Sequence, residues 1–100
     1  MKLYLNDLGL LCAVGNSKAE VLARLWAGDR SGLIESDTFG HKTIVGQCKA
    51  ELPEIDLPLI MYDCRNNQLL LAALTQIRAT VDHMIMRFGA DRIGVVLGTS

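Results

Sequence analysis

Three cysteines, Cys12, Cys48 and Cys64, are the residues of this sequence that could act as nucleophiles or bind a metal. A nucleophilic cysteine needs a lowered thiol pKa, which a helix N-terminus or a neighbouring cation provides. Cys64 meets this requirement best, because Arg65 follows it and a helix is predicted to begin nearby. Free cysteines are among the most buried residue types, so packing is the favoured role for all three. Their odd number and wide spacing, without a C-x-x-C pair, predict neither a disulfide framework nor a zinc site.

The two histidines lack the neighbours that mark a general base or a metal site. His41 lies in a polar, glycine-containing stretch, and His83 lies between Asp82 and Met84 on the polar side of a predicted helix. A helical metal pair would need a second ligand three or four residues from His83, and none is present there. The final Gly98-Thr99-Ser100 is typical of an anion-binding turn but lacks the glycines and lysine of a phosphate loop. We therefore predict no catalytic residue, no cofactor site and no metal site in this chain.

Charge and hydropathy restrict the class of protein further. Ten basic and eleven acidic residues give a formal net charge of −1, and the basic residues are scattered singly. Such a distribution lacks the basic stripe that binds phosphates, so nucleic-acid binding is not expected. No run reaches the roughly 18 apolar residues that span a bilayer, and Asn6-Asp7 interrupts the first apolar stretch too early for a signal peptide. A cytoplasmic protein without membrane association is expected.

Capping residues and periodicity predict two helices. Ser17 and Glu20 have the spacing of a capping box, and the helix that follows is expected to stop at Gly28. One face of this helix is predicted to contain Val21, Leu22, Leu25 and Trp26. A longer amphipathic helix is predicted over residues 66–88, because apolar residues recur there at spacings of three and four.

Three strands are predicted around these helices. Residues 2–14 and 43–50 contain short apolar runs, and residues 93–97 form an unbroken apolar run typical of a parallel strand covered on both faces. The order strand, helix, strand, helix, strand predicts a βαβαβ arrangement of the α/β class. Two helices cannot cover both faces of such a sheet, so residues 1–100 are expected to be part of a larger domain.

The connecting segments contain glycine, proline and polar residues. Residues 29–42 are expected to form a loop that Leu33 and Ile34 anchor to the core. Pro53 and Pro58 predict a non-helical surface connection over residues 51–59.

Four stretches carry a resemblance to a known family. They are residues 7–16 (DLGLLCAVGN), 21–33 (VLARLWAGDRSGL), 65–73 (RNNQLLLAA) and 92–99 (RIGVVLGT). In this order they resemble the amino terminus of the β-ketoacyl-acyl-carrier-protein synthases. The first stretch resembles the family's first strand and glycine turn, and the second resembles the first helix with its Ala-Gly-x-Ser-Gly phrase. The third resembles the start of the long helix, and the fourth resembles the buried strand and glycine turn after it. The sequence departs from the family at Asn6-Asp7, where Thr-Gly is usual, and at Ala13-Val14, where a Pro often precedes the glycine turn.

The resemblance implies a thiolase-like fold, of which residues 1–100 would be the amino-terminal βαβαβ portion of a helix-covered mixed sheet. It implies an acyltransferase that joins an acyl group to malonyl-carrier protein by decarboxylative Claisen condensation, in fatty-acid or polyene/polyketide biosynthesis. Acyl carrier protein is the implied partner, no cofactor is implied, and the full-length protein is expected to be a homodimer or heterodimer. The family's nucleophilic cysteine and two histidines follow the turn at residues 98–99. The cysteines and histidines of this chain do not match those motifs, so the chain alone is expected to be inactive.

Two alternatives stay open from the sequence. A non-catalytic partner subunit of the chain-length-factor type has the same fold and lacks the nucleophile, and the residue that distinguishes it lies beyond Ser100. A free-standing small α/β binding module would instead be a monomer that unfolds cooperatively, and only two helices would then cover the strand at residues 93–97.

Overall fold

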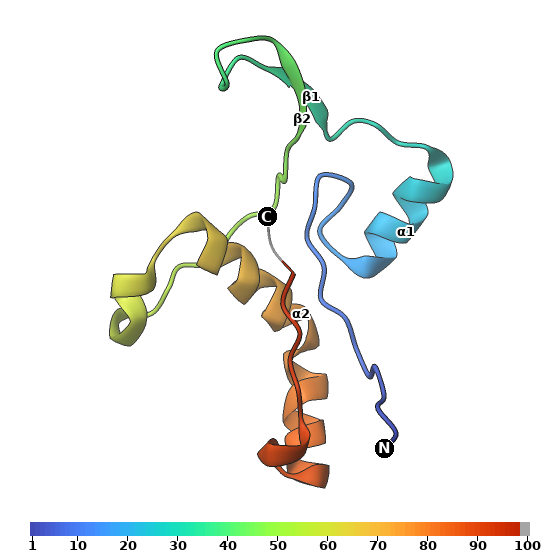
Figure 1. Ribbon diagram of the computed structural model, residues 1–100, viewed down its shortest axis with the longest axis vertical. Coiled ribbons are helices and arrows are strands. Elements are labelled where there is room, and N and C mark those ends of the chain that lie inside the picture. Colours follow the sequence, from blue (N-terminus) through green and yellow to red (C-terminus); the bar gives the residue numbers. More distant parts are fainter. Residues whose placement is uncertain (99–100) are drawn as a thin grey trace. The chain divides into compact units, whose positions relative to one another are not determined.

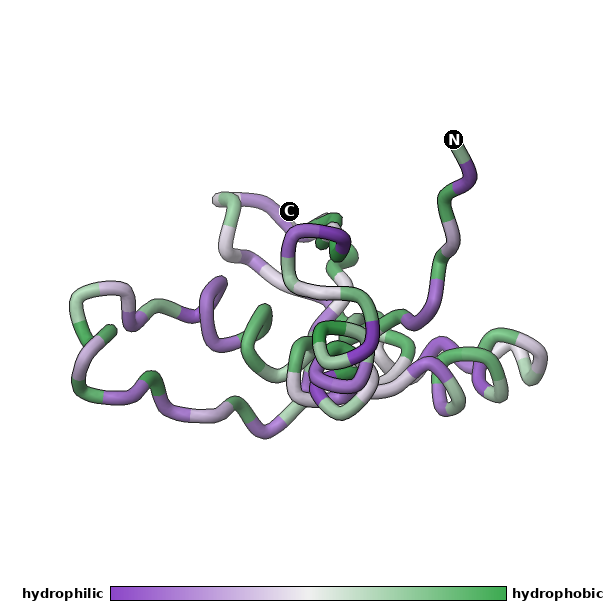
Figure 2. The backbone as a smooth tube through the Cα atoms, turned by 90° about the horizontal axis from the view of Figure 1, so that it is seen from below, coloured by the Kyte–Doolittle hydropathy of each residue, from purple (hydrophilic) through white to green (hydrophobic). Residues whose placement is uncertain are grey.

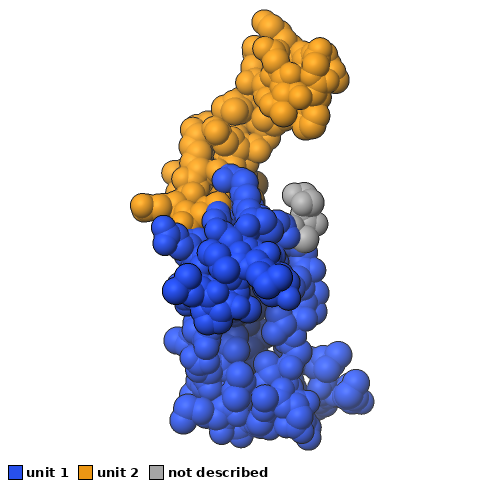
Figure 3. All heavy atoms as spheres, turned by 90° about the vertical axis from the view of Figure 1, so that its left-hand side faces the viewer, with its two compact units in different colours: residues 1–8, 53–100 blue, residues 9–52 orange. Residues whose placement is uncertain are grey.

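The computed structural model describes residues 1–98, which contain two α-helices, a two-stranded hairpin and two short 3-10 helices (Figure 1). In chain order the elements are α1 (Lys18–Ala27), β1 (Leu33–Ser36), β2 (Thr43–Gly46), η1 (Leu57–Tyr62), α2 (Arg65–Phe88) and η2 (Ala90–Arg92). They divide into two compact units, which are coloured separately in Figure 3. Unit 2 comprises Gly9–Leu52, and unit 1 comprises Met1–Leu8 together with the chain from Pro53 onward.

The ends of α1 confirm the helix predicted after Ser17. The Ser17 hydroxyl accepts a hydrogen bond from the Glu20 backbone N–H at 3.2 Å, and a Glu20 carboxylate oxygen accepts one from the Asn16 N–H at 2.8 Å. These two bonds satisfy backbone donors that have no partner within the helix. At the other end Gly28 adopts a left-handed conformation with φ of 65°, and its N–H donates to the Leu25 carbonyl.

The predicted apolar face of α1 is present, but only one of its residues is buried. Val21 is buried, with 7% of its surface exposed, whereas Leu22 and Leu25 are exposed and Trp26 is 86% exposed. The side of α1 that faces the rest of unit 2 contains Val21 and Arg24 instead. These residues are three positions apart and therefore lie on the same side of the helix. The larger apolar stripe of α1 therefore points to solvent.

The two strands form an antiparallel hairpin with Leu33 opposite Gly46 and Ser36 opposite Thr43. The expected loop over residues 29–42 is wrong in part, because β1 lies within it, and β2 is shorter than the strand expected over residues 43–50. A turn makes this pairing possible: the Gly40 N–H donates to the Asp37 carbonyl at 2.9 Å, and Gly40 has φ of 78°. The four-residue strands are too short to show a clear alternation in sequence.

Unit 2 is held together by a close approach of backbone to backbone. Residues 12–15 form a turn in which the Cys12 N–H and the Gly15 carbonyl lie 3.0 Å apart. This turn packs on the hairpin so closely that a Cβ atom at Gly32 would overlap the Ala13 carbonyl oxygen. A Cβ at Gly46 would lie 2.9 Å from the Ala13 Cβ, which is shorter than real contacts of this kind. Glycine is required at residue 32 for this reason.

In unit 1 the long helix predicted over residues 66–88 is confirmed as α2, Arg65–Phe88. Its half-buried side chains repeat at spacings of three and four; they include Leu70, Leu74, Ile77, Val81 and Met84. The Thr80 hydroxyl donates a hydrogen bond of 2.6 Å to the Asp7 carboxylate, which attaches the N-terminal segment to this helix. The Gly89 N–H donates to the Ile85 carbonyl at 2.9 Å, so the helix ends at the predicted glycine.

The prediction that residues 51–59 contain no helix is wrong at their end, where η1 begins at Leu57. Pro58 lies within the first two residues of this 3-10 helix. Proline is compatible with that position, because the first N–H groups of a helix have no acceptor within the helix.

The predicted βαβαβ arrangement is not found in residues 1–98. Residues 2–14 and 93–97, which were expected to be strands, contain none, although Ile93 has the extended dihedral angles φ −109° and ψ 121°. A strand needs a neighbouring strand to satisfy its backbone groups, and β1 and β2 pair only with each other in the described part of the chain. Thr99 and Ser100, which belong to the predicted glycine turn, lie outside the described residues.

Apolar side chains remain largely uncovered. The accessible surface is 8435 Å², whereas a folded protein of this mass exposes about 5,600 Å², and two separate units of half the mass would expose about 6,700 Å². Figure 2 shows hydrophobic stretches along the whole trace, and Leu3, Leu5 and Val96 are among the exposed apolar residues. Val21, at 7% exposed, is the one buried large apolar side chain of the part described, and none there is fully buried. The surface that needs covering is therefore large compared with the core that the chain forms.

We expect Gly32→Ala to loosen unit 2, because the added methyl group would overlap the Ala13 carbonyl. Overpacking of this kind costs about 1–3 kcal/mol. The measurement is amide hydrogen exchange at Gln47, whose N–H donates to the Gly32 carbonyl at 2.8 Å. Exchange there should accelerate at least about fivefold in the variant.

Gly94→Ala is the matched control for this substitution, because a Cβ at Gly94 meets nothing within 4 Å. It should leave Gln47 exchange unchanged. Equal exchange rates in wild type and Gly32→Ala would contradict the packing of Ala13 on Gly32.

Candidate functional site

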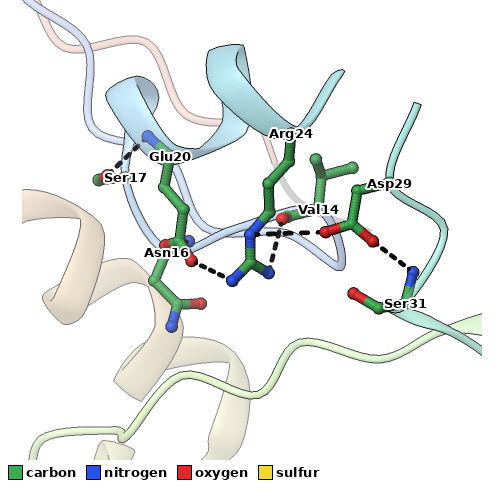
Figure 4. Close-up of polar contacts among 7 residues, drawn as sticks. All are labelled: Val14, Asn16, Ser17, Glu20, Arg24, Asp29 and Ser31. Atoms are coloured by element: carbon green, nitrogen blue, oxygen red, sulfur yellow. Dashed lines mark hydrogen bonds and ion pairs between the residues drawn. The ribbon is translucent and has the colours of Figure 1, made fainter. Parts of the chain in front are cut away.

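A polar cluster with a pocket beside it lies in unit 2 around Arg24 (Figure 4). One guanidinium nitrogen, Nη2, lies 2.8 Å from Glu20 Oε1, and Nη1 donates to the Val14 carbonyl at 3.2 Å. The Nε atom lies 3.8 Å from Asp29 Oδ2. Arg24 therefore connects α1 to the turn before the helix and to the loop after it.

A pocket of about 250 Å³ lies beside this cluster. Its lining consists of Cys12, Ala13, Gly15, Asn16, Glu20, Arg24, Ser31, Gly32 and Lys49. The positive charges of Arg24 and Lys49 are offset by the negative charges of Glu20 and of Asp29, which lies close to the Arg24 guanidinium group, so the pocket lacks a strong net charge. No histidine lines it, so the Cys12 thiol has no imidazole base within the pocket. The arrangement suits a structural cluster more than a catalytic site.

Asp29 is the titratable group with a clear shift in this cluster. The Ser31 backbone N–H, which donates to its carboxylate at 2.8 Å, lowers the pKa of Asp29 most. The Ser31 hydroxyl and the charge of Arg24 lower this pKa as well, and partial desolvation opposes them. Because the folded-state pKa is depressed, the stabilisation is present above the ordinary aspartate pKa and is lost as the pH falls through the folded-state value.

The three cysteines occupy different settings. Cys12 is half-buried and lines the pocket, and Cys48 is also half-buried. Cys64 is exposed, so the prediction that it packs in the interior is wrong for this chain. It is the N-cap residue of α2, and its side chain makes no capping hydrogen bond.

The two histidines belong to different units. His41 is exposed in the turn of the hairpin, and His83 is exposed on α2 in the other unit. Among residues 1–98, no group of three or more His, Cys, Asp or Glu side chains is placed to hold a metal ion. Residues 1–98 also contain no helix with the length and hydropathy needed to cross a membrane.

The Arg24 cluster was not predicted, although the sequence contains parts of its pattern. Glu20 and Arg24 are four residues apart on a predicted helix, which is the spacing of an ion pair. Asp29 and Ser31 have the spacing at which an aspartate accepts a bond from the backbone two residues on. The contact with the Val14 carbonyl depends on how the preceding turn folds back, which no local pattern indicates.

Comparison with known proteins shows to which family this chain is related. No family model and no curated protein matches the sequence. Among solved structures, the chain is similar to a chain of the ketosynthase ApeO in complex with its chain length factor ApeC, from Xenorhabdus doucetiae. The sequences are 36% identical and the TM-score is 0.78 over 86% of this chain. The chain is related to the β-ketoacyl synthases.

This relationship confirms the family resemblance and the thiolase-like fold of a ketosynthase segment. The chain spans 22% of the length of the matched chain, about a fifth. Within that segment the described elements are two helices and a hairpin, rather than the βαβαβ unit expected from the sequence.

We expect Ser31→Ala to raise the pKa of Asp29 part of the way toward its ordinary value. The substitution removes the hydroxyl, whereas the backbone N–H at residue 31, which has the largest effect, remains. The measurement is an NMR pH titration of the Asp29 carboxyl carbon, with Ser36→Ala as control, because Ser36 bonds Thr38 instead. A pKa of Asp29 that is the same in Ser31→Ala as in wild type would show that the hydroxyl has no part in the shift.

Proposed function

We propose that this chain is the amino-terminal segment of a β-ketoacyl synthase-type acyltransferase. The full-length parent would catalyse decarboxylative Claisen condensation of an acyl group with malonyl-carrier protein, in fatty-acid or polyene/polyketide biosynthesis. The observation that supports this is the 36% identity and TM-score of 0.78 to a ketosynthase complex. We further propose that the partner of the parent is acyl carrier protein, which would deliver both thioesters.

In this proposal residues 1–100 serve as part of a scaffold, and other parts of the same domain cover their apolar surface. The accessible surface exceeds that of a folded protein of this mass by about 2,800 Å², and exceeds that of two separate units by about 1,700 Å². A standard protein interface buries only about 800 Å² per partner. The uncovered surface is therefore at least twice what one standard interface buries, and we expect the rest of the domain to cover it. The match to about a fifth of a longer chain agrees with that expectation.

The condensation itself would use residues outside this segment. It needs a thiolate to accept the acyl group and hydrogen-bond donors directed at the oxygen of the enolate formed on decarboxylation. The pocket beside Cys12 contains no histidine, and Cys64 is exposed at the start of α2 with His83 on the opposite half of that helix. None of these arrangements provides a nucleophile, a base and an oxyanion donor together.

A second candidate is a non-catalytic subunit of the chain-length-factor type. The matched structure contains a ketosynthase together with its chain length factor, so either role is compatible with the similarity. The same complex supports a heterodimer as the assembly of the parent. The two candidates differ at the nucleophile position of the parent, where a catalytic subunit has a cysteine and a chain length factor has another residue.

We expect the isolated 100-residue chain to show no condensation and no malonyl decarboxylation, because its described residues form no catalytic arrangement. The parent should turn over acyl and malonyl thioesters of acyl carrier protein, alone or with a partner subunit. The measurement is release of labelled carbon dioxide from malonyl-carrier protein. Turnover by the isolated chain would overturn the proposal that it is a scaffold segment. A parent that binds no acyl carrier protein, with or without a partner subunit, would overturn the proposed function.

Replacing Cys12, Cys48 and Cys64 together by serine should leave the condensation rate of the parent within about threefold of wild type, which corresponds to less than 1 kcal/mol. The reason is that the proposed nucleophile is a different cysteine. Thermal unfolding of the variant, measured beside the activity, shows whether a loss comes from misfolding. A stable variant that loses more than about a hundredfold of its rate would assign a catalytic role to one of these thiols. The three single substitutions would then show which one.

Binding of a hydrophobic dye tests the proposal that other parts of the parent cover the apolar surface of residues 1–100. The isolated chain should enhance the fluorescence of 1-anilinonaphthalene-8-sulfonate strongly, because side chains such as Leu3, Trp26 and Val96 are exposed. The native parent should enhance it weakly at the same molar concentration. Equal, weak fluorescence from both would show that residues 1–100 bury their apolar surface without the rest of the domain.

A further inference from the structure

We draw no further inference here: the strongest candidate, the exposed apolar face that Leu22, Leu25 and Trp26 form on α1, carries nothing because no observation in the structure shows what covers it.

Discussion

The contact between the Ala13 carbonyl and the bare backbone of Gly32 is the constraint on which unit 2 depends. It brings the turn before α1 onto the hairpin at a distance that any side chain at residue 32 would prevent. The Gly32 carbonyl is held as well, by the N–H of Gln47. Arg24 adds a bond to the carbonyl of the next residue, Val14. Turn, helix and hairpin are thus positioned by backbone groups, with little help from apolar packing.

Hydrogen bonding and apolar burial normally stabilise a small domain together, but in this chain they are unequally developed. Hydrogen bonds and caps define each element well, as at Ser17 before α1 and Gly89 after α2. Burial of apolar surface, which supplies most of the free energy of folding, is limited, because Val21 is the one buried large apolar side chain among the described residues and the others are half-buried or exposed. Under the proposed function, other parts of the parent domain would supply the burial that this chain lacks. The relationship to a longer ketosynthase chain fits this division.

The helices could be predicted from sequence because their determinants are local. The capping box at Ser17 and Glu20, and the stops at Gly28 and Gly89, mark the ends of α1 and α2 within a residue or two. Strands depend on partners far along the chain, so β1 was missed and the apolar runs at residues 2–14 and 93–97 were assigned strands that lack a neighbour here. The outward direction of Trp26 was missed for the same reason, since periodicity identifies an apolar stripe without showing which side of the helix is covered.

The exposed run from Val95 to Leu97 has a consequence for how a longer polypeptide would be made. Synthesis proceeds from the N-terminus, so this run would leave the ribosome before any segment that follows it in such a polypeptide. An exposed apolar run readily associates with another nascent chain or binds a chaperone. Slow translation beyond this point would therefore lengthen the period in which aggregation competes with folding. The yield of soluble protein would then depend on the rate of synthesis as well as on final stability.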